Sequence, residues 1–247
     1  HSFPTRRSSD LHYTICHSHY MITEQLHLVP DISGCIVMNM KQDSSLDLEY
    51  WGPTTRMVTV WKKEGEDQVQ YFVEFRPSGS HALFLADQYP YRDMRIELKQ
   101  VNHRCHALIM EAYDKAEGEA SFFQQLDTIF LSMMNKQDDA MAALMQGLSA
   151  KTRIADVMDS FGYSRRHLQR LVQQRLGYSM KTIQKIQRIN QAVSLLKEQK
   201  LTLTAIAQQC GFYDQAHFIH DFREICNVTP QQYQKQLQDY YNESFKF

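Results

Sequence analysis

The last hundred residues of the chain carry the same pattern of apolar and polar positions twice, about fifty residues apart. Residues 154–183 form the first copy and residues 203–233 form the second. In each copy a short amphipathic segment leads into a glycine, Gly162 or Gly211, and a longer amphipathic segment follows. Apolar residues at helical spacing on both sides of such a glycine predict two helices joined by a tight turn. This is the pattern of a helix-turn-helix, whose second helix is shaped to enter a DNA major groove.

The second copy carries start and stop signals for each of its predicted helices. Thr202 precedes the first helix as a capping hydroxyl, and Gly211 supplies a turn residue that tolerates positive φ. The second helix is predicted over residues 214–226, and Asn227 ends it because asparagine accepts a left-handed backbone. Thr229, followed by a proline, begins another helix. The residues expected to face the core are Phe218, Phe222 and Ile225.

A single amphipathic helix is predicted between the two copies, over residues 181–199. At about 1.5 Å per residue it would be about 28 Å long. Successive major grooves on one face of B-DNA are about 34 Å apart, so two second helices held by this linker suit neighbouring grooves. A small mismatch in spacing would be accommodated by bending the duplex, at a cost of a few kcal/mol.

The outward face of each second helix holds side chains suited to binding DNA. Arginine and glutamine can bond guanine and adenine edges bidentately, and the first copy is rich in both. The second copy carries histidines at the same place, so we expect more electrostatic affinity from the first copy and more restricted contacts from the second. The candidate DNA-binding residues are Arg165, Arg166, Gln169, Arg170 and Gln173 in the first copy, and Gln215, Ala216, His217, His220 and Arg223 in the second.

Residues 13–100 carry a different pattern, of short runs rich in β-branched and aromatic residues. Strands are predicted at residues 35–40, 57–61 and 69–75, separated by clusters of turn-forming residues. The segment at residues 62–67 is interpreted as a hairpin connection between the last two strands. The first part of the chain is therefore expected to be rich in β-structure.

Between these strands and the repeated units the pattern becomes helical. A short helix within residues 81–94 is expected to stop before a proline, and residues 94–101 are interpreted as a further strand or an extended segment. Longer helices are predicted over residues 118–135 and 138–148. The polar segment at residues 134–139 is interpreted as the boundary between two domains, since strand patterning is lost after it.

Residues 1–12 show neither a helical nor a strand period. They resemble a translated sequencing-adapter read joined to an incomplete gene, and we interpret them as a non-native or disordered leader. The alternative is a genuine arm in which Arg6 and Arg7 contact DNA. The chain lacks the charged and then apolar layout of a secretory signal, and no run of about 18 apolar residues predicts a membrane span.

Charge is distributed unevenly along a chain whose net charge is −1. Residues 150–247 hold 14 Lys and Arg against 8 Asp and Glu, a net of +6, and the remaining residues hold 13 against 20, a net of −7. A basic half suits a polyanionic partner, although solvated surface is the ordinary reason for such an excess. The 5 cysteines, without a C-x-x-C pair, fit reduced thiols in a cytoplasmic protein.

Little in the sequence supports catalysis or metal binding. It contains no P-loop, G-x-S-x-G motif or paired-carboxylate arrangement, so neither enzyme activity nor a cofactor is expected. His103, Cys105 and His106 form the cluster nearest in type to a metal site. Without a second cluster at a zinc spacing, a structural role is favoured for them, and the same objection applies to His17 and His19.

The repeated units resemble the DNA-binding domain of the AraC/XylS family of bacterial transcription regulators, over residues 139–240. The similarity is carried by YSRRHLQRLVQQRLGYS, by the linker residue Arg188, and by IAQQCGFYDQAHFIHDFREICNVTPQQY. It implies base contacts from Arg166, Gln169 and Arg170 in the first copy, and from Gln215, Ala216 and His220 in the second. The chain departs from the family pattern at three positions. His220, with Asp221 beside it, stands where many relatives carry arginine. Met158 replaces a residue that is usually small, and Gln234 replaces one that is often basic.

The first half is similar to an N-terminal domain attached to some members of this family. The residues that carry this similarity are GPTTR at 52–56, YFVEFRPSG at 71–79 and the apolar segment at 82–84. In the family such domains sense a small molecule or mediate self-association.

Pattern and resemblance together predict an α+β protein of two domains. A β-rich sensor or dimerisation domain is expected at residues 13–135, and an all-α domain of two helix-turn-helix units joined by a linker helix at residues 136–247. The leading hypothesis is a cytoplasmic, sequence-specific regulator, an activator or a repressor, that binds double-stranded DNA as a monomer or homodimer. RNA polymerase and a small-molecule effector are its further expected partners.

Two alternatives remain at this point. One is a DNA-binding module fused to a repair or other enzyme, although a family alkyl acceptor carries its cysteine in a Pro-Cys-His setting that the sequence lacks. The other is an adaptor that binds another protein and not DNA.

Overall fold

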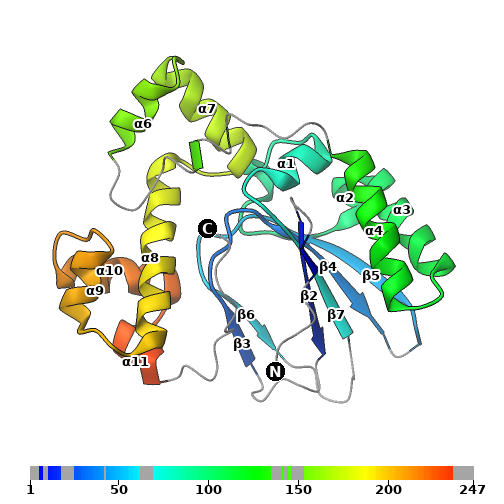
Figure 1. The fold of residues 1–247 in the computed structure, drawn as a ribbon, viewed down its shortest axis with the longest axis horizontal. Helices are drawn as coiled ribbons and strands as arrows, with labels where there is room; N and C mark the ends of the chain where they lie inside the picture. The colour runs from blue at the N-terminus through cyan, green and yellow to red at the C-terminus, as the bar shows by residue number, and fades with distance from the viewer. Residues whose placement is uncertain are drawn as a thin grey trace.

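A six-stranded antiparallel sheet forms the centre of the N-terminal half (Figure 1). In this computed structural model the described residues are 6–7, 11–17, 25–41, 43–61, 69–134, 141, 144–145 and 153–235. The strand order is β1-β2-β7-β4-β5-β8, and every neighbouring pair is antiparallel. The strands are β1 (Arg6–Arg7), β2 (Leu11–His17), β4 (Cys35–Met40), β5 (Leu46–Trp51), β7 (Val69–Phe75) and β8 (Arg95–Glu97).

A second sheet pairs β3 (Gln25–Leu28) with β6 (Val58–Trp61). This pairing contradicts the expected hairpin between the strands predicted at residues 57–61 and 69–75, because β6 and β7 belong to different sheets. The connecting residues 62–67 lie outside the described part of the chain. Local composition predicted both strands correctly. Which strand pairs with which depends on how the faces of the sheets pack, and a turn-like segment between two strands does not indicate this.

The large sheet buries one set of alternating side chains beneath two helices. In β7 the residues Tyr71, Val73 and Phe75 are buried while their neighbours are half-buried, as the two-residue period of a strand dictates. Helices α3 (His103–Lys115) and α4 (Glu119–Met133) cover this face of the sheet (Figure 1). The ring of Tyr71 packs edge-on against that of Phe123, with the centroids 5.4 Å apart.

The short elements around these helices differ in part from the prediction. Helix α1 (Gly79–Phe84) ends earlier than proline requires, because Leu85 adopts a left-handed φ of 53°. The proline itself lies in a 3-10 turn, η2 (Tyr89–Tyr91). The strand expected at residues 94–101 is confined to β8, and a single helical turn, α2 (Leu98–Val101), follows. Helix α4 was predicted, whereas α3 was not.

Two predictions concern segments that are described only in part. Within residues 1–12, expected to lack regular structure, Arg6 and Arg7 pair as a strand with Tyr13 and His12. Within the helix expected at residues 138–148, the described residues Met141, Leu144 and Met145 are helical. The proposed boundary segment lies almost entirely outside the described residues.

The C-terminal part of the described chain is all helical, so the predicted α+β architecture with a β-rich first half and an α-helical second half is confirmed (Figure 1). Two units, each a short helix, a turn and a longer helix, flank one long helix along the chain. A final short helix packs against that long helix. Among the described residues, none of the helices is both long and apolar enough to cross a bilayer. The helices are α6 (Ile154–Ser160), α7 (Arg165–Leu176), α8 (Met180–Glu198), α9 (Leu203–Gln209), α10 (Gln215–Cys226) and α11 (Pro230–Lys235).

The two halves of the molecule share a core. Ile32 and Met57, both in the N-terminal half, are buried in the same apolar cluster as the C-terminal helices. The backbone N–H of Met57 donates to the carbonyl of Ile225 in α10 at 2.8 Å, and the side-chain amide of Asn190 in α8 donates to the carbonyl of Pro30 at 3.3 Å. The sheet half therefore braces the helical half through backbone hydrogen bonds as well as apolar packing.

Candidate nucleic-acid interface

Both second helices of the repeated units begin and end with capping residues. The hydroxyl of Ser164 accepts a hydrogen bond from the N–H of His167 at the start of α7, and the carboxylate of Asp214 accepts one from the N–H of His217 at the start of α10. Such caps satisfy backbone donors that a helix leaves without partners. At the other end, Asn227 takes the left-handed conformation that the sequence predicted, with a φ of 59°.

The inward faces of these helices pack on α8, in α10 at the residues that the spacing predicted. Leu168, Val172 and Leu176 of α7 are buried, and so are Phe218, Phe222 and Ile225 of α10. Each such side chain contributes about 1.5–3 kcal/mol when fully removed from water. The apolar stripe of α8 lies between the two units and consists of Ile183, Ile186, Ile189, Val193 and Leu196.

The linker helix α8 separates the two units along its length. It comprises 19 residues, so at about 1.5 Å per residue it is about 28 Å long. Figure 1 shows α6 and α7 at one end of α8, with α9 and α10 beside its other end. The length matches the expectation for a linker between units that bind neighbouring grooves.

The first unit offers the cationic outward face that was predicted. Arg166, Gln169 and Gln173 are exposed and have no side-chain partner among the described residues. Arg165 is instead paired with Asp159 of α6 at 3.1 Å, and a guanidinium nitrogen of Arg170 lies 3.3 Å from the ring Nδ1 of its neighbour His167. The first three side chains are therefore the most available for contacts outside the chain.

The second unit holds more of its outward side chains in internal contacts. The side-chain oxygen of Gln215 accepts a hydrogen bond from the Thr204 hydroxyl at 2.6 Å. His217 has partners at both ring nitrogens: Nδ1 accepts from the backbone N–H of Tyr213 at 3.4 Å, and Nε2 lies 3.3 Å from the Asp221 carboxylate. Of the residues predicted to bind DNA in this unit, Ala216 and Arg223 are exposed and make no side-chain hydrogen bond in the described part of the chain. His220 is also exposed, and one of its ring nitrogens is hydrogen-bonded to Asp221.

The negative charge of Asp221, the residue beside His220, is neutralised in the structure. Its carboxylate lies 3.0 Å from the Lys185 ammonium of α8, which also contacts Glu224 at 2.8 Å. Although burial lowers the pKa of Lys185, its hydrogen bonds with Glu224 and Asp221 raise it overall, so the ammonium remains charged. Lys185 is thereby occupied within the protein.

Sequence reasoning missed an exposed tyrosine at the second turn. Two residues lie between Gly211 and the cap Asp214, whereas one lies between Gly162 and the cap Ser164. The additional residue is Tyr213, whose side chain is 92% exposed. The sequence contained this signal, because the helix after Gly211 begins one residue later, relative to its glycine, than the helix after Gly162 does.

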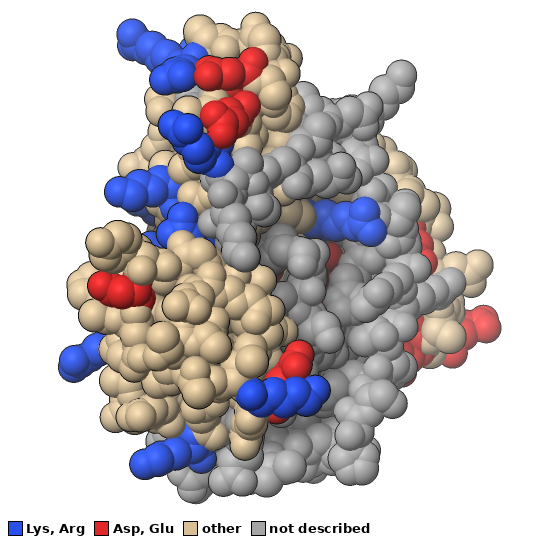
Figure 2. Space-filling model, turned by 60° about the vertical axis from the view of Figure 1, so that its left-hand side comes forward, with Lys and Arg blue, Asp and Glu red and all other residues tan. Residues whose placement is uncertain are grey.

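Charged side chains are unevenly spread over the face that carries the two units. Figure 2 shows Lys and Arg gathered over the upper unit, formed by α6 and α7, together with a few acidic groups. The visible surface of the lower unit is mostly uncharged, with isolated charges at its edges (Figure 2). This distribution agrees with the expectation that the first unit supplies more of the electrostatic attraction.

Two clusters hold candidate metal-ligating side chains. In the first, Cys105 is buried in α3, and burial raises the pKa of its thiol to about 12. A second group, formed by His220, Asp221 and Glu224, brings its ligand atoms within 4.8 Å of one another. The Lys185 ammonium already serves as the cation for both carboxylates.

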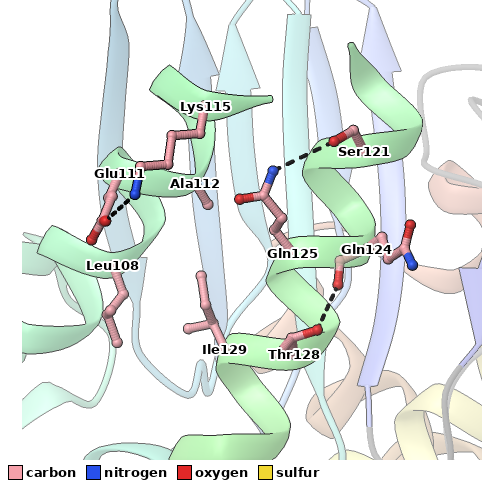
Figure 3. A pocket seen from close by; sticks show the side chains of 9 residues that line it. All are labelled: Leu108, Glu111, Ala112, Lys115, Ser121, Gln124, Gln125, Thr128 and Ile129. Carbon is pink, nitrogen blue, oxygen red and sulfur yellow. Dashed lines mark hydrogen bonds and ion pairs between the residues drawn. The ribbon is translucent and has the colours of Figure 1, made fainter. Parts of the chain in front are cut away.

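A shallow pocket of about 420 Å³ lies between α3 and α4, on the helices that cover the sheet (Figure 3). Its polar side chains bond to one another: Lys115 with Glu111, and the Gln125 amide with the Ser121 hydroxyl at 3.4 Å. Leu108 and Ile129 supply its apolar wall. None of its lining residues comes from α7 or α10, so it does not contribute to the interface on the helical half.

The tandem arrangement of two capped helices on one linker defines a helix-turn-helix DNA-binding domain. A helix-turn-helix domain family matches residues 157–236. The HTH-type transcriptional regulator YfiF of Bacillus subtilis is 30% identical over 112 residues, covering 45% of this chain and 35% of that protein. The xylose operon regulatory protein of Escherichia coli K12 is 26% identical over 81 residues, covering 33% of this chain and 21% of that protein. The chain thus spans well under half the length of these curated relatives.

The structure of ToxT from Vibrio cholerae aligns over 92% of this chain and 98% of its own, with 14% identity and a TM-score of 0.47. The sequence relatives and the matching domain family agree with the tandem units seen in the structure. The C-terminal part of this chain is a helix-turn-helix domain of the AraC/XylS type, as the resemblance in the sequence predicted.

Proposed function

We propose that the protein is a sequence-specific transcription regulator of the AraC/XylS type that inserts α7 and α10 into two adjacent major grooves. The observation that carries the proposal is the unpartnered face of α7, where Arg166, Gln169 and Gln173 lie exposed on a helix capped and buried on its other side. Arginine and glutamine are the side chains best suited to bond base edges from such a helix. A solvated structural helix does not require this combination.

The proposed base contacts of the first unit are Arg166, Gln169 and Arg170, with Gln173 beside them and Arg165 near the phosphates. Those of the second unit are Ala216 and His220, with Gln215 at the start of the helix and Arg223 near the phosphates. His217 is proposed as a residue that orients the unit, because both of its ring nitrogens have partners within the protein. Phosphate contacts position such a helix, and base contacts supply the specificity.

The N-terminal half is proposed to modulate this binding. Support comes from its two backbone bonds to the recognition helices, from Met57 to Ile225 and from Gln88 to Gln174. A change in the sheet half, caused by an effector or by association with a second copy, would alter the relative positions of α7 and α10. In this proposal residues 13–135 and 136–247 are the sensing and DNA-binding domains, the protein acts in the cytoplasm where its DNA is, and RNA polymerase is a further partner.

The test is selection of duplexes from a random pool by the full chain, followed by fluorescence anisotropy on the enriched sequence. The expected result is an enriched motif with two half-sites about 10 base pairs apart, which is one helical turn. Binding should weaken steeply with salt, since several phosphates must be neutralised. A pool that shows no enrichment, with equal binding to scrambled duplexes, would overturn the proposal and favour the protein-binding adaptor.

A further inference from the structure

The two recognition helices carry different hydrogen-bonding groups at one equivalent position. Arg170 is the sixth residue after the cap of α7, and His220 is the sixth residue after the cap of α10. A guanidinium group can only donate hydrogen bonds. A neutral imidazole donates from one nitrogen and accepts at the other, so the role of His220 depends on which nitrogen carries the proton.

The neighbouring carboxylate decides where that proton lies. The ring Nδ1 of His220 is hydrogen-bonded to the Oδ1 atom of Asp221 at 3.4 Å. An ionised carboxylate has only acceptor atoms, so in the neutral ring Nδ1 must be the protonated nitrogen. The Nε2 atom is then left without a proton, as a hydrogen-bond acceptor.

Asp221 is held in this acceptor role by the groups around it. Its side chain is only 11% exposed, and its Oδ1 atom lies 3.0 Å from the Lys185 ammonium. Its other oxygen, Oδ2, lies 3.3 Å from Nε2 of His217. The Nδ1 atom of that ring accepts from the backbone N–H of Tyr213, so its Nε2 also carries a proton. Each of the three side chains that contact the carboxylate in the described part of the chain, Lys185, His217 and His220, therefore donates to it.

The acceptor atom of His220 belongs to an exposed side chain. Its side chain is 75% exposed, although the carboxylate that it contacts is buried. The Nδ1 atom of His220 is thus bonded within the protein, and its Nε2 atom has no hydrogen-bond partner in the described part of the chain. An acceptor in the major groove matches the exocyclic amino groups of adenine and cytosine, which are the donors that bases present there.

We propose that His220 selects a base bearing an exocyclic amino group, adenine N6 or cytosine N4, and that Asp221 is the positioning residue that gives it this polarity. The inference rests on the proposed function, because it assumes that α10 enters a major groove. The first unit would have the opposite polarity at the equivalent position, where Arg170 donates to the O6 and N7 atoms of guanine. The protein would then read two different bases with the same position of its repeated unit.

The first experiment examines the protein without DNA. In the full chain labelled with 15N at histidine, ring-nitrogen NMR distinguishes protonated from unprotonated nitrogens, and the His220 signals are assigned by comparison with His220→Gln. The expected result at a pH where the ring is neutral is an unprotonated Nε2 and a protonated Nδ1. A protonated Nε2 in the neutral ring would overturn the inference.

The second experiment measures base preference on the duplex selected by the full chain. Each base pair of the second half-site is replaced in turn, and binding is followed by anisotropy for the unaltered protein, His220→Arg and Asp221→Asn. The unaltered protein should prefer adenine or cytosine at one position, and His220→Arg should shift that preference to guanine by at least about fivefold. Asp221→Asn, which can donate as well as accept, should reduce the preference there without changing the first half-site.

A matched control is Glu224→Gln, which alters the second partner of Lys185 at a side chain that lies near His220 but is not hydrogen-bonded to it. It should leave the base preference unchanged, and thermal melting should establish that all variants are folded. If no duplex is selected by the unaltered chain, the proposed function itself fails. If a duplex is selected but its preference is the same in His220→Arg and Asp221→Asn, only the present inference is overturned.

Discussion

The backbone N–H of Gln88 donates a hydrogen bond to the carbonyl of Gln174 at 2.6 Å, which joins η2 of the sheet half to the last turn of the recognition helix α7. Carbonyls in the last turn of a helix have no partner within the helix, so this bond satisfies an acceptor that would otherwise need water. The side chain of Gln88 is fully buried and continues the connection into the sheet. Its Oε1 atom accepts from the Tyr50 hydroxyl at 2.6 Å, and its Nε2 atom donates to the carbonyl of Ala86 at 2.8 Å.

Replacement of Gln88 by alanine should therefore destabilise the protein. The Tyr50 hydroxyl would lose its acceptor in a buried site, which costs about 1–3 kcal/mol. Urea unfolding of Gln88→Ala measures the loss, and Tyr50→Phe is the matched variant that removes the donor instead. Because the two groups are partners, the double variant should lose less stability than the two single variants added together. Strict additivity would contradict the hydrogen bond.

Replacement of Arg166 or Gln169 by alanine should weaken binding to the selected duplex by about 1–3 kcal/mol and relax base preference at one position of the first half-site. Both side chains are exposed and make no side-chain bond in the described part of the chain, so their loss should leave stability within about 0.5 kcal/mol of the unaltered protein. Anisotropy on cognate and scrambled duplexes separates the two effects. An equal loss on both duplexes would mean that these residues contact phosphates and not bases.

Replacement of Arg223 by alanine should weaken binding to all duplexes alike. The residue is exposed near the end of α10, and the proposed role is a phosphate contact. The slope of log affinity against log salt should become shallower by about 0.9, the value for one phosphate. Lys185→Met is the comparison, because Lys185 is occupied by Asp221 and Glu224 and should leave the salt slope little changed. A salt slope unchanged by Arg223→Ala would exclude this residue from the phosphate contacts.

Two glycines with positive φ should respond differently to alanine. An added Cβ at Gly162, whose φ is 66°, meets no atom within 4 Å, so the cost is backbone strain alone, about 1–2 kcal/mol. At Gly177, whose φ is 79°, the added Cβ lies 3.3 Å from the carbonyl oxygen of Gln88 and must also displace η2. Gly177→Ala should therefore be the more destabilising in urea unfolding. Equal losses would show that η2 yields without cost.

The buried thiols should be unreactive in the folded protein. Burial raises the pKa of Cys105 to about 12 and also raises that of Cys226, so neither supplies thiolate near neutral pH. Because the folded pKa lies above the ordinary thiol value of 9.0, the associated stability is present below about pH 9 and is lost as the pH rises towards 12. Thiol labelling with a disulfide reagent at pH 8, before and after denaturation, checks the prediction. Rapid native labelling of Cys105 or Cys226 would revive the alkyl-acceptor alternative.

The helix-turn-helix units could be predicted in detail because their signals are local. Thr202 caps α9, Asn227 ends α10 in a left-handed conformation, and Thr229 precedes α11, each at the position that the sequence indicated. Caps and turns depend on residues three or four apart, and the apolar spacing that buries Phe218 and Phe222 repeats at the helical period. Such features are legible without knowledge of the rest of the fold.

The N-terminal half was less predictable because its determinants are distant in sequence. Helix α3 escaped notice since its buried residues, Cys105, Ile109 and Ala112, are few and lie among His, Arg and Lys side chains. The partner of β6 is β3, more than thirty residues earlier, and no local signal reports it. A strand is recognised by its own residues, but its neighbour is chosen by the sheet.

Within the candidate interface, the sequence identified the outward residues but not how they are held. The contact between Lys185 and Asp221 joins two helices that are far apart along the chain, so the sequence showed Asp221 only as a departure from the family pattern beside His220. The bonds from Met57 and Gln88 use backbone N–H groups, which every residue except proline possesses, and side-chain identity does not reveal them. These contacts could be found only from the three-dimensional arrangement.

The paired bonds from Met57 to Ile225 and from Gln88 to Gln174 have a consequence for the length of operator that the proposed regulator accepts. One inserted base pair rotates a half-site by about 34° around the duplex relative to its neighbour. Two recognition helices joined by α8 alone could follow such a rotation by pivoting, but helices that are both bonded to the N-terminal half cannot. The N-terminal half would therefore restrict the spacing between the half-sites that the regulator accepts. Loss of these two bonds would allow binding to operators of more than one spacing before it lowered the affinity for any single operator.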